Sequence, residues 1–279
     1  MNNLNNNYHV AVPTAFNSDE SLNVEATFQH ILNLYEKGIR SILICGSTGE
    51  QHSLSLSEKR CLVESIEQEN RFPSDLELIF GVASIRLAEA VELAQVVSQS
   101  KKIAAVLLGY PPYLIPTQEE AYYYTQTVLK EIQNKAVILY NNPRRTGFDL
   151  ALKTILKLLE NKNIIGIKEA GDKQKVVQLV AKSPKELFIF AGGDLDLEDK
   201  ISLGFNSLSS IAGNIYPLEI STYFNALHTR SKMPQNSLDE MAIKLATVFT
   251  ESPLPHLKER ITKTEGINMG RCRLPLGAT

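Results

Sequence analysis

The chain has 279 residues, of which 43% are hydrophobic, and a formal net charge of −2 at pH 7 with a pI near 6.2. This charge gives no electrostatic footprint for nucleic acid, and no apolar run approaches the roughly 20 residues of a membrane span. The three cysteines, Cys45, Cys61 and Cys272, are odd in number and widely spaced, which argues against a disulfide framework and favours a reducing compartment. We expect a cytoplasmic protein with a small-molecule ligand and neither nucleic-acid nor membrane partners.

The chain begins with an Asn-rich stretch that lacks the basic region and apolar core of a targeting segment, so we expect a disordered tail over residues 1–7. From residue 8 onward, short apolar runs alternate with helical patterns. The expected strands are Tyr8–Val12, Ile39–Cys45, Leu76–Val82, Ile103–Leu108, Ala136–Tyr140, Ile164–Lys168, Leu187–Ala191 and Ser207–Ala212. The first expected helix covers Val24 to Tyr35, and the one after the last strand begins near Pro217.

Eight strand–helix units in about 230 residues predict an α/β fold, a closed (β/α)8 or TIM barrel of parallel strands. An open doubly wound sheet is the alternative, but the sequence has neither GxGxxG after the first strand nor GxxxxGK[ST] anywhere. One or two further helices are expected between about Ser237 and Thr264. The predicted organisation is a tail over 1–7, a barrel over 8–230 and a C-terminal helical extension over 231–279.

The apolar run from Ile164 to Ala170 delivers one amine at its end. Its lack of polar alternation is typical of a strand buried on both faces of a parallel sheet, so Lys168 should emerge at the carboxyl edge, where barrel enzymes place their chemistry. A partly desolvated amine is more often uncharged, and a free amine can form a Schiff base with a ketone. The alternative is that Lys168 merely ends the strand and pairs with Glu169 or Asp172.

Other polar residues also follow strand ends. The second strand leads into Gly46-Ser47-Thr48-Gly49-Glu50, whose hydroxyls and amides can hold a carboxylate or simply cap the next helix. The fifth strand ends at Tyr140, a phenol that can relay protons, and Arg145 follows in a loop, where a guanidinium can bind a carboxylate or remain solvated. Because carboxyl ends of barrel strands meet at one mouth, these groups should converge.

Two more candidates come from the last strands. Gly193 follows the seventh strand, where paired glycines indicate either close approach of a ligand or a plain turn. Ser209 lies at the end of the eighth. The five histidines are scattered and share no ligand spacing, so we expect no metal site.

Three of these motifs resemble a known family, the class I aldolases that include dihydrodipicolinate synthase and N-acetylneuraminate lyase, and the match covers nearly the whole chain. The family's GxTGE, YNxP and GxKE motifs are similar to Gly46–Glu50, Tyr140–Pro143 and Gly166–Glu169. The resemblance implies that Lys168 condenses with the ketone of a 2-oxo acid such as pyruvate, with no cofactor beyond this covalent imine. It also implies that Tyr140 shuttles protons and that Ser47 and Thr48 receive the pyruvate carboxylate.

Within the family, Arg145-Thr146-Gly147 resembles the RTG that synthases use for the carboxylate of aspartate semialdehyde, and Arg273–Leu276 is similar to the end of synthases. Leu195 stands where lyases tend to carry a glutamate, which favours a synthase. Ser47 points the other way, because lyases carry a serine at this position of the GxTGE loop and synthases usually carry a threonine. The resemblance favours a synthase that condenses pyruvate with L-aspartate 4-semialdehyde in lysine and diaminopimelate biosynthesis. The alternatives are a lyase of N-acetylneuraminate or another 2-oxo-3-deoxy sugar acid, and a non-catalytic regulator that binds an oxo acid.

Counted without gaps, Tyr113 stands where synthases insert a tyrosine from a neighbouring subunit to complete a relay with Ser47 and Tyr140; another register would put Leu114 there. The resemblance therefore implies a homodimer or homotetramer, with Lys168, Tyr140, Ser47 and Tyr113 as catalytic residues and Thr48, Arg145, Gly193 and Ser209 as substrate-binding residues.

Feedback-inhibited synthases of the family bind lysine with an asparagine and two histidines. Their places in this chain hold Ile85, Leu56 and Lys59, and only Glu89 is retained. We therefore expect that lysine does not inhibit this protein.

Overall fold

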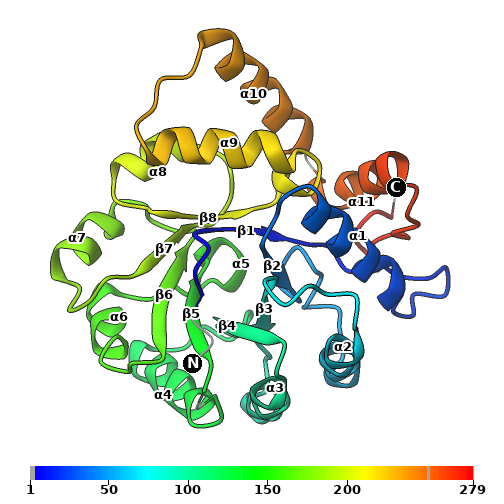
Figure 1. Ribbon diagram of the computed structural model, residues 1–279. Helices are drawn as coiled ribbons and strands as arrows, with labels where there is room; N and C mark the ends of the chain where they lie inside the picture. The colour runs from blue at the N-terminus through cyan, green and yellow to red at the C-terminus, as the bar shows by residue number, and fades with distance from the viewer. Residues whose placement is uncertain (1–3, 133, 250–251, 279) are drawn as a thin grey trace.

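The computed structural model describes residues 4–132, 134–249 and 252–278. Eight parallel strands close into a barrel in sequence order, with β8 pairing back onto β1, and helices surround them (Figure 1). The strands are β1 Tyr8–Ala11, β2 Ser41–Ile44, β3 Glu77–Val82, β4 Ile103–Gly109, β5 Ala136–Asn141, β6 Ile164–Glu169, β7 Phe188–Ala191 and β8 Ser207–Ser210. The predicted (β/α)8 barrel is confirmed.

The helices alternate with these strands along the chain, as expected from the periodic apolar pattern. The outer helices are α1 Val24–Glu36, α2 Leu56–Gln68, α3 Leu87–Gln99, α4 Gln118–Leu129, α6 Leu152–Leu158, α7 Lys175–Lys182, α8 Leu197–Ser202 and α9 Pro217–His228. Two helices follow the barrel, α10 Gln235–Val248 and α11 Pro253–Glu265. Two short elements lie in loops at the carboxyl ends of strands, α5 Pro143–Thr146 and the 3-10 turn η1 Ala212–Asn214.

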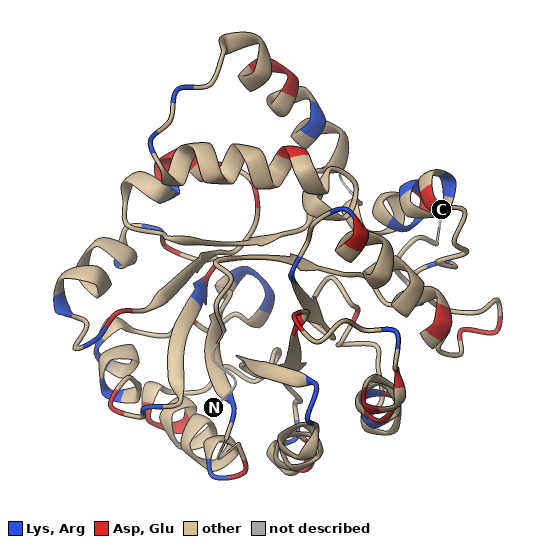
Figure 2. Ribbon diagram, in the orientation of Figure 1, with Lys and Arg blue, Asp and Glu red and all other residues tan. Residues whose placement is uncertain are grey.

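The strands are buried on both faces, which explains their continuous apolar sequence. Their outward side chains join the large core beneath the helices, and their inward side chains fill the barrel. The inner cluster contains Leu43, Ile79, Leu107, Ile138 and Phe190. Acidic and basic residues are interspersed on the outer helices (Figure 2), and within the described ranges no helix is long and apolar enough to cross a membrane.

Two expectations about chain boundaries need correction. Of the tail expected over residues 1–7, residues 1–3 lie outside the described residues, but Leu4 is buried in the inner cluster and the Asn5 amide donates to Glu77 at 2.6 Å. The eighth strand, expected to reach Ala212, ends at Ser210. The buried Asp194 carboxylate accepts the backbone N–H groups of Ile211 and Ala212 at 2.9 and 3.1 Å, which draws the chain out of the sheet there.

The C-terminal extension returns to the barrel. Helix α11 lies beside α1 (Figure 1), and a small cluster of Ala15, Ala26, Leu257, Ile261 and Met269 fills their interface. From Gly266 the chain then runs back to the carboxyl-end mouth of the barrel, where Leu276 lines a cavity.

Candidate active site

Lys168 is the penultimate residue of β6 and lies inside the carboxyl-end mouth. Its side chain is only 9% exposed, and strand pairing sets it directly beside Tyr140 of β5. The Lys168 Nζ atom lies 4.9 Å from the centre of the Tyr140 ring. Adjacent strands thus hold the amine beside the phenol, and paired strands fix their relative position more rigidly than a loop would.

The neighbouring carboxylate does not pair with this amine. Glu169 points elsewhere: both of its carboxylate oxygens accept the Asn141 side-chain amide at 2.9 Å, and Oε1 also accepts the Gly171 N–H at 2.6 Å. Among the described residues, no acidic side chain forms an ion pair with Lys168, and the pairing with Glu169 or Asp172 left open by the sequence does not occur.

Burial lowers the pKa of Lys168, and the positive charge of Arg145 acts in the same direction. Tyr140 and Asp194 oppose this because their negative forms favour the ammonium. The pKa of the lysine nevertheless ends below its ordinary value of 10.5. A larger share of the amine is therefore uncharged and nucleophilic near neutral pH than for a solvated lysine.

Tyr140 is the centre of a small hydrogen-bond network. The Asn142 side-chain amide donates to its hydroxyl at 2.7 Å, and the Ser47 hydroxyl lies 3.4 Å away. Burial raises the pKa of Tyr140, but the charge of Lys168, the two hydrogen bonds and Arg145 outweigh it, so the pKa falls below 10.0. A phenol tuned in this way can give and take protons beside the amine.

The loop that carries Ser47 and the half-buried Thr48 adopts a strained but well-supported backbone. Cys45 and Glu50 have φ values of 57° and 53°, in a region that non-glycine residues rarely occupy. The Cys45 carbonyl approaches Gly81 so closely that a Cβ there would lie 2.1 Å from its oxygen. Thr14 holds the other side of the loop through a 2.7 Å hydrogen bond to the Gly49 carbonyl.

The C-terminal extension anchors this loop from outside the barrel. Glu50 is fully buried and forms a 2.6 Å ion pair with Lys258 of α11, which is 1% exposed. The Glu50 carboxylate also accepts the Arg273 backbone N–H at 2.9 Å. Arg273 in turn donates to the Ser53 carbonyl at 2.8 Å and pairs with Glu58. The loop of Ser47 and Thr48 and the C-terminal extension are therefore bonded firmly to each other.

A cavity of about 350 Å³ opens above Tyr140. Arg145, exposed in the turn of α5, stands at its rim with His52 and Leu276, and Ser47 lies in its wall. Apolar groups and glycines form most of the remaining lining, which comprises Cys45, Gly46, Gln51, Gly81, Val82, Ala83, Leu107, Gly109, Tyr110, Pro112 and Thr146. The cavity offers a single permanent cation to a ligand above the phenol.

The structure does not place all the expected site residues at this cavity. Tyr113 is 87% exposed and adopts φ 78°, so its phenol points into solvent rather than toward Tyr140. Gly193 has φ 125° and open space where a Cβ would stand. Ser209 is 1% exposed and lies inside the barrel. Within the described ranges, no group of three or more His, Cys, Asp or Glu side chains could hold a metal ion.

Three residues that organise the site were not identified from the sequence. Asn142 was part of the YNxP motif, but its bond to the Tyr140 hydroxyl depends on the turn into α5. Asp194 is buried and accepts the Ser210 hydroxyl besides the two amides of the β8 loop. Lys258 lies more than two hundred residues from Glu50 in the sequence. The only hint of their ion pair in the sequence was a lysine within an ordinary amphipathic helix pattern.

Sequence comparison places the chain among known proteins. A profile of the Dihydrodipicolinate synthetase family matches residues 5–279. The 4-hydroxy-tetrahydrodipicolinate synthase of Trichlorobacter lovleyi is 32% identical over 282 residues, covering 96% of this chain and 91% of that protein. The protein of the same name from Methanosphaera stadtmanae is 31% identical over 278 residues, with the same two coverages of 96% and 91%.

Solved structures give the same picture. The CdNal protein of Clostridium difficile, determined in complex with mannosamine, matches with a TM-score of 0.86 at 25% identity, over 96% of this chain and 92% of that one. The dihydrodipicolinate synthase of Acinetobacter baumannii, determined with pyruvate, matches with a TM-score of 0.82 at 26% identity, over 96% and 91%. The likeness therefore extends to proteins with different names that were solved with different small molecules.

Proposed function

The chain belongs to the dihydrodipicolinate synthetase family of class I, pyruvate-dependent lyases, and from this premise we propose that it joins pyruvate to an aldehyde through a covalent imine on Lys168. The observation that carries the proposal is the buried amine of Lys168, which forms no ion pair with any described acidic side chain and lies 4.9 Å from the centre of the Tyr140 ring. Imine chemistry needs a free amine and a nearby proton carrier, and adjacent strands supply both.

The reaction follows from this geometry. The Lys168 amine attacks the ketone carbon of pyruvate, and Tyr140, hydrogen-bonded to Ser47 and Asn142, moves protons between nitrogen and oxygen so that water can leave. The hydroxyls of Ser47 and Thr48 and their loop amides hold the pyruvate carboxylate. Loss of a methyl proton then gives an enamine, which attacks the aldehyde carbon, and hydrolysis of the new imine restores the lysine.

For the second substrate we propose L-aspartate 4-semialdehyde, which makes the protein a 4-hydroxy-tetrahydrodipicolinate synthase. Arg145 can bind one carboxylate at the rim of the 350 Å³ cavity. The rest of the lining is largely apolar or glycine, which suits a short chain better than a polyhydroxylated sugar, because buried sugar hydroxyls would need partners. We also assign Gly193 and Ser209 to the substrate-binding side of β7 and β8, as the resemblance implies.

A sugar-acid lyase is the second candidate. It is favoured by Ser47 in the catalytic loop and by the likeness to CdNal, which was solved with mannosamine. In this reaction Lys168 and Tyr140 would keep their roles, and the aldehyde would be a sugar instead of a semialdehyde.

We further propose that the enzyme is a homo-oligomer in which Tyr113 serves a partner subunit. Tyr113, Leu114, Ile115 and Ile85 are 87%, 60%, 68% and 55% exposed, and apolar groups gathered beside a site are typical of interfaces. A tyrosine held at positive φ and directed away from its own chain is suited to reach the Ser47–Tyr140 pair of another.

Reduction with borohydride in the presence of pyruvate tests the imine, because it should fix the adduct on the peptide that contains Lys168. A mass gain on another lysine would refute the mechanism. Incubation with pyruvate and a set of aldehydes, followed by mass spectrometry of the products, then separates the two candidates. Product from a sugar aldehyde but none from L-aspartate 4-semialdehyde would favour the lyase.

A further inference from the structure

The cavity above Tyr140 receives one side chain from outside the barrel. The other lining residues lie between Cys45 and Thr146, on β2 to β5 and the loops that follow these strands. Leu276 comes from the C-terminal extension, after α11. The extension therefore supplies part of the cavity wall, and the side chain at position 276 sets the size and polarity of that part.

The segment that carries Leu276 is bonded to the barrel. The Arg273 backbone N–H donates to the Glu50 carboxylate at 2.9 Å, and the Arg273 guanidinium donates to the Ser53 carbonyl at 2.8 Å. The same guanidinium lies 4.4 Å from the centre of the Phe16 ring. The Leu276 N–H then donates to the Arg273 carbonyl at 3.1 Å and closes a turn. A side chain on a turn held in this way presents a fixed apolar surface to a ligand.

Several polar side chains of the lining already have partners in the protein. The Gln51 side-chain oxygen accepts the Lys59 amine at 3.2 Å, and the Thr146 hydroxyl donates to the Phe148 carbonyl at 3.0 Å. The guanidinium at the rim is taken by the substrate carboxylate in the reaction proposed above. A ligand hydroxyl that faced Leu276 would lose its water without gaining a partner, which weakens binding.

The two kinds of aldehyde differ at the carbon next to the aldehyde group. In L-aspartate 4-semialdehyde this carbon is a methylene, whereas in a sugar-like aldehyde such as D-glyceraldehyde it carries a hydroxyl. With the aldehyde beside Tyr140 and the carboxylate on Arg145, this carbon lies between them, in the cavity that Leu276 lines. An apolar wall favours the methylene, because burial of a methylene is favourable and burial of an unpaired hydroxyl is not.

We propose that Leu276 is a specificity-determining residue, which contacts the methylene beside the aldehyde and excludes aldehydes that carry a hydroxyl at that carbon. The inference rests on the proposed reaction at Lys168 and leaves its chemistry unchanged: the enamine carbon still bonds to the aldehyde carbon, and Leu276 takes no part in proton transfer. We expect a preference of about 10²-fold, which is the factor by which an apolar pocket rejects an added hydroxyl.

The ratio of kcat/KM for the two aldehydes, each measured with pyruvate, tests this role. Leu276→Asn keeps a branched side chain but supplies a hydrogen-bond donor and acceptor. It should raise kcat/KM for D-glyceraldehyde and lower it for L-aspartate 4-semialdehyde, so that the ratio falls at least about tenfold. Leu276→Ala, which opens the wall to water, should lower the ratio by a smaller factor, and Leu276→Met, which keeps the wall apolar, should retain the parental ratio.

Leu274→Asn is the matched control, because Leu274 lies in the same segment but is 69% exposed and outside the cavity lining. It should retain the parental ratio. Borohydride trapping with pyruvate alone should give the parental rate of adduct formation in every variant, since the wall at position 276 acts on the second substrate. This readout also shows that each variant has folded, and if Leu276→Asn does not form the adduct, Leu276→Ala decides.

The two hypotheses fail differently. If the parent forms no adduct at Lys168, the proposed function is wrong. If the parent and the variants form the adduct but share one ratio, only the role of Leu276 is refuted. An equal loss of activity on both aldehydes would also refute it, because a purely structural change does not distinguish a methylene from a hydroxyl. A parent that prefers D-glyceraldehyde would overturn the exclusion directly.

Discussion

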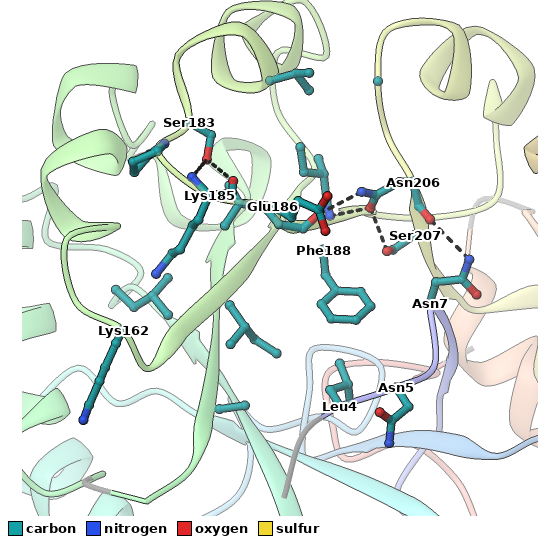
Figure 3. A pocket seen from close by; sticks show the side chains of 18 of the residues that line it. Leu4, Asn5, Asn7, Lys162, Ser183, Lys185, Glu186, Phe188, Asn206 and Ser207 are labelled. Atoms are coloured by element: carbon teal, nitrogen blue, oxygen red, sulfur yellow. Dashed lines mark hydrogen bonds between the residues drawn. The ribbon is translucent and has the colours of Figure 1, made fainter. Parts of the chain in front are cut away.

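The two mouths of the barrel differ in a way that cavity size does not reveal. The amino-terminal mouth has the larger cavity, about 970 Å³ against about 350 Å³ at the carboxyl end. Several of its polar groups are engaged in structural bonds, some of which are drawn in Figure 3. The Asn206 side chain bonds to the backbone of Leu187 and Ile189, Ser183 accepts the Lys185 amide, and the Lys185 amine donates to the Asn161 carbonyl at 2.9 Å.

The carboxyl-end mouth shows the opposite pattern. In the part of the chain that the structure describes, its amine forms no ion pair with an acid, its phenol has a lowered pKa, and its loop contains two non-glycine residues at positive φ. The buried amine and the two positive-φ residues each raise the free energy of the folded chain, and the loop keeps its conformation because Glu50 and Lys258 hold it from outside. Reactive side chains without ion-pair partners, held by a well-anchored loop, therefore indicate that the carboxyl-end mouth is the active one. A larger cavity whose polar groups form structural hydrogen bonds does not indicate an active site.

The largest effect is expected from removing one lysine at each mouth. Lys168→Ala should abolish the borohydride-trapped adduct and lower turnover by at least about 10³-fold, because no other group can form the imine. Lys185→Ala, at the amino-terminal cavity, should remain within about twofold of the parent, as for most surface changes. Comparable losses in both variants, measured with L-aspartate 4-semialdehyde and pyruvate, would break the contrast between the mouths.

The loop at the active mouth can be weakened by a substitution in α11, outside the barrel. Lys258→Met leaves the buried Glu50 carboxylate without its cation, although the Arg273 N–H still donates to it, and should lower the free energy of unfolding by about 3–5 kcal/mol. Lys263→Met, which removes an exposed pair with Glu259 on the same helix, should change it by less than about 1 kcal/mol. Urea denaturation measures both. Adding Glu50→Gln to Lys258→Met should recover part of the loss, and a double variant as unstable as the sum of the two singles would argue against a direct pair.

The sequence was sufficient to predict the barrel because its determinants are local. Apolar runs without alternation, each followed by a helical pattern, predicted all eight strands to within two residues at either end. The same reasoning placed Lys168 and Tyr140 at one mouth, since strand order and strand ends determine which residues meet there.

Contacts between distant segments could not be obtained in this way. Nothing near Glu50 indicates that Lys258 will reach it, and nothing near Leu276 indicates that it will line the cavity. These contacts depend on the path that the C-terminal extension takes across the barrel. The ordered course of residues 4–7 was missed for a related reason. An Asn-rich stretch contains few apolar side chains that could be buried, and Leu4 is buried because it packs into the inner cluster of the barrel.

Among groups at the active mouth, Arg145 should matter mainly for the second substrate, because burial is the larger cause of the lowered pKa of Lys168. Arg145→Ala removes a charged hydrogen bond worth about 1.5–3 kcal/mol, or roughly 10- to 150-fold in kcat/KM for L-aspartate 4-semialdehyde. Adduct formation with pyruvate should persist. Arg144→Ala, its exposed neighbour outside the cavity lining, is the control and should behave like the parent. Equal activity of the Arg145 variant on the semialdehyde would favour the sugar-acid reaction.

A smaller loss of turnover is expected from changing Tyr113, whose side chain points away from its own subunit. Tyr113→Phe should lower turnover about tenfold, less than the 10²–10⁴-fold typical of a proton-transfer group, because Ser47 and Asn142 still serve Tyr140. Tyr123→Phe changes another exposed tyrosine, 65% exposed on α4, and should have no effect. Sedimentation at assay concentration should show an oligomer. A fully active monomer would contradict the shared site.

The smallest effect should come from lysine added as a ligand, because a second cavity beside the active mouth is already occupied by a cation. This cavity, of about 480 Å³, is lined by Leu56, Lys59, Ile85 and Glu89. The Lys59 amine, nearly buried, donates to the Gln51 side chain and the Ala83 carbonyl, each at 3.2 Å. The Glu89 carboxylate already accepts Ser84 at 2.7 Å.

A bound lysine would therefore meet like charge, which costs about 1 kcal/mol in water and about 4 kcal/mol near a protein surface at a separation of about 4 Å. It would also meet the side chain of Ile85, which cannot hydrogen-bond, and an acid that is already engaged. We expect millimolar lysine to leave turnover unchanged, in the parent and also in Lys59→Ala, because removal of the cation does not create the missing polar partners. Titration in a coupled assay measures this, and half-inhibition below about 1 mM, which corresponds to about 4 kcal/mol of binding free energy, would show that the cavity accepts lysine despite its own cation.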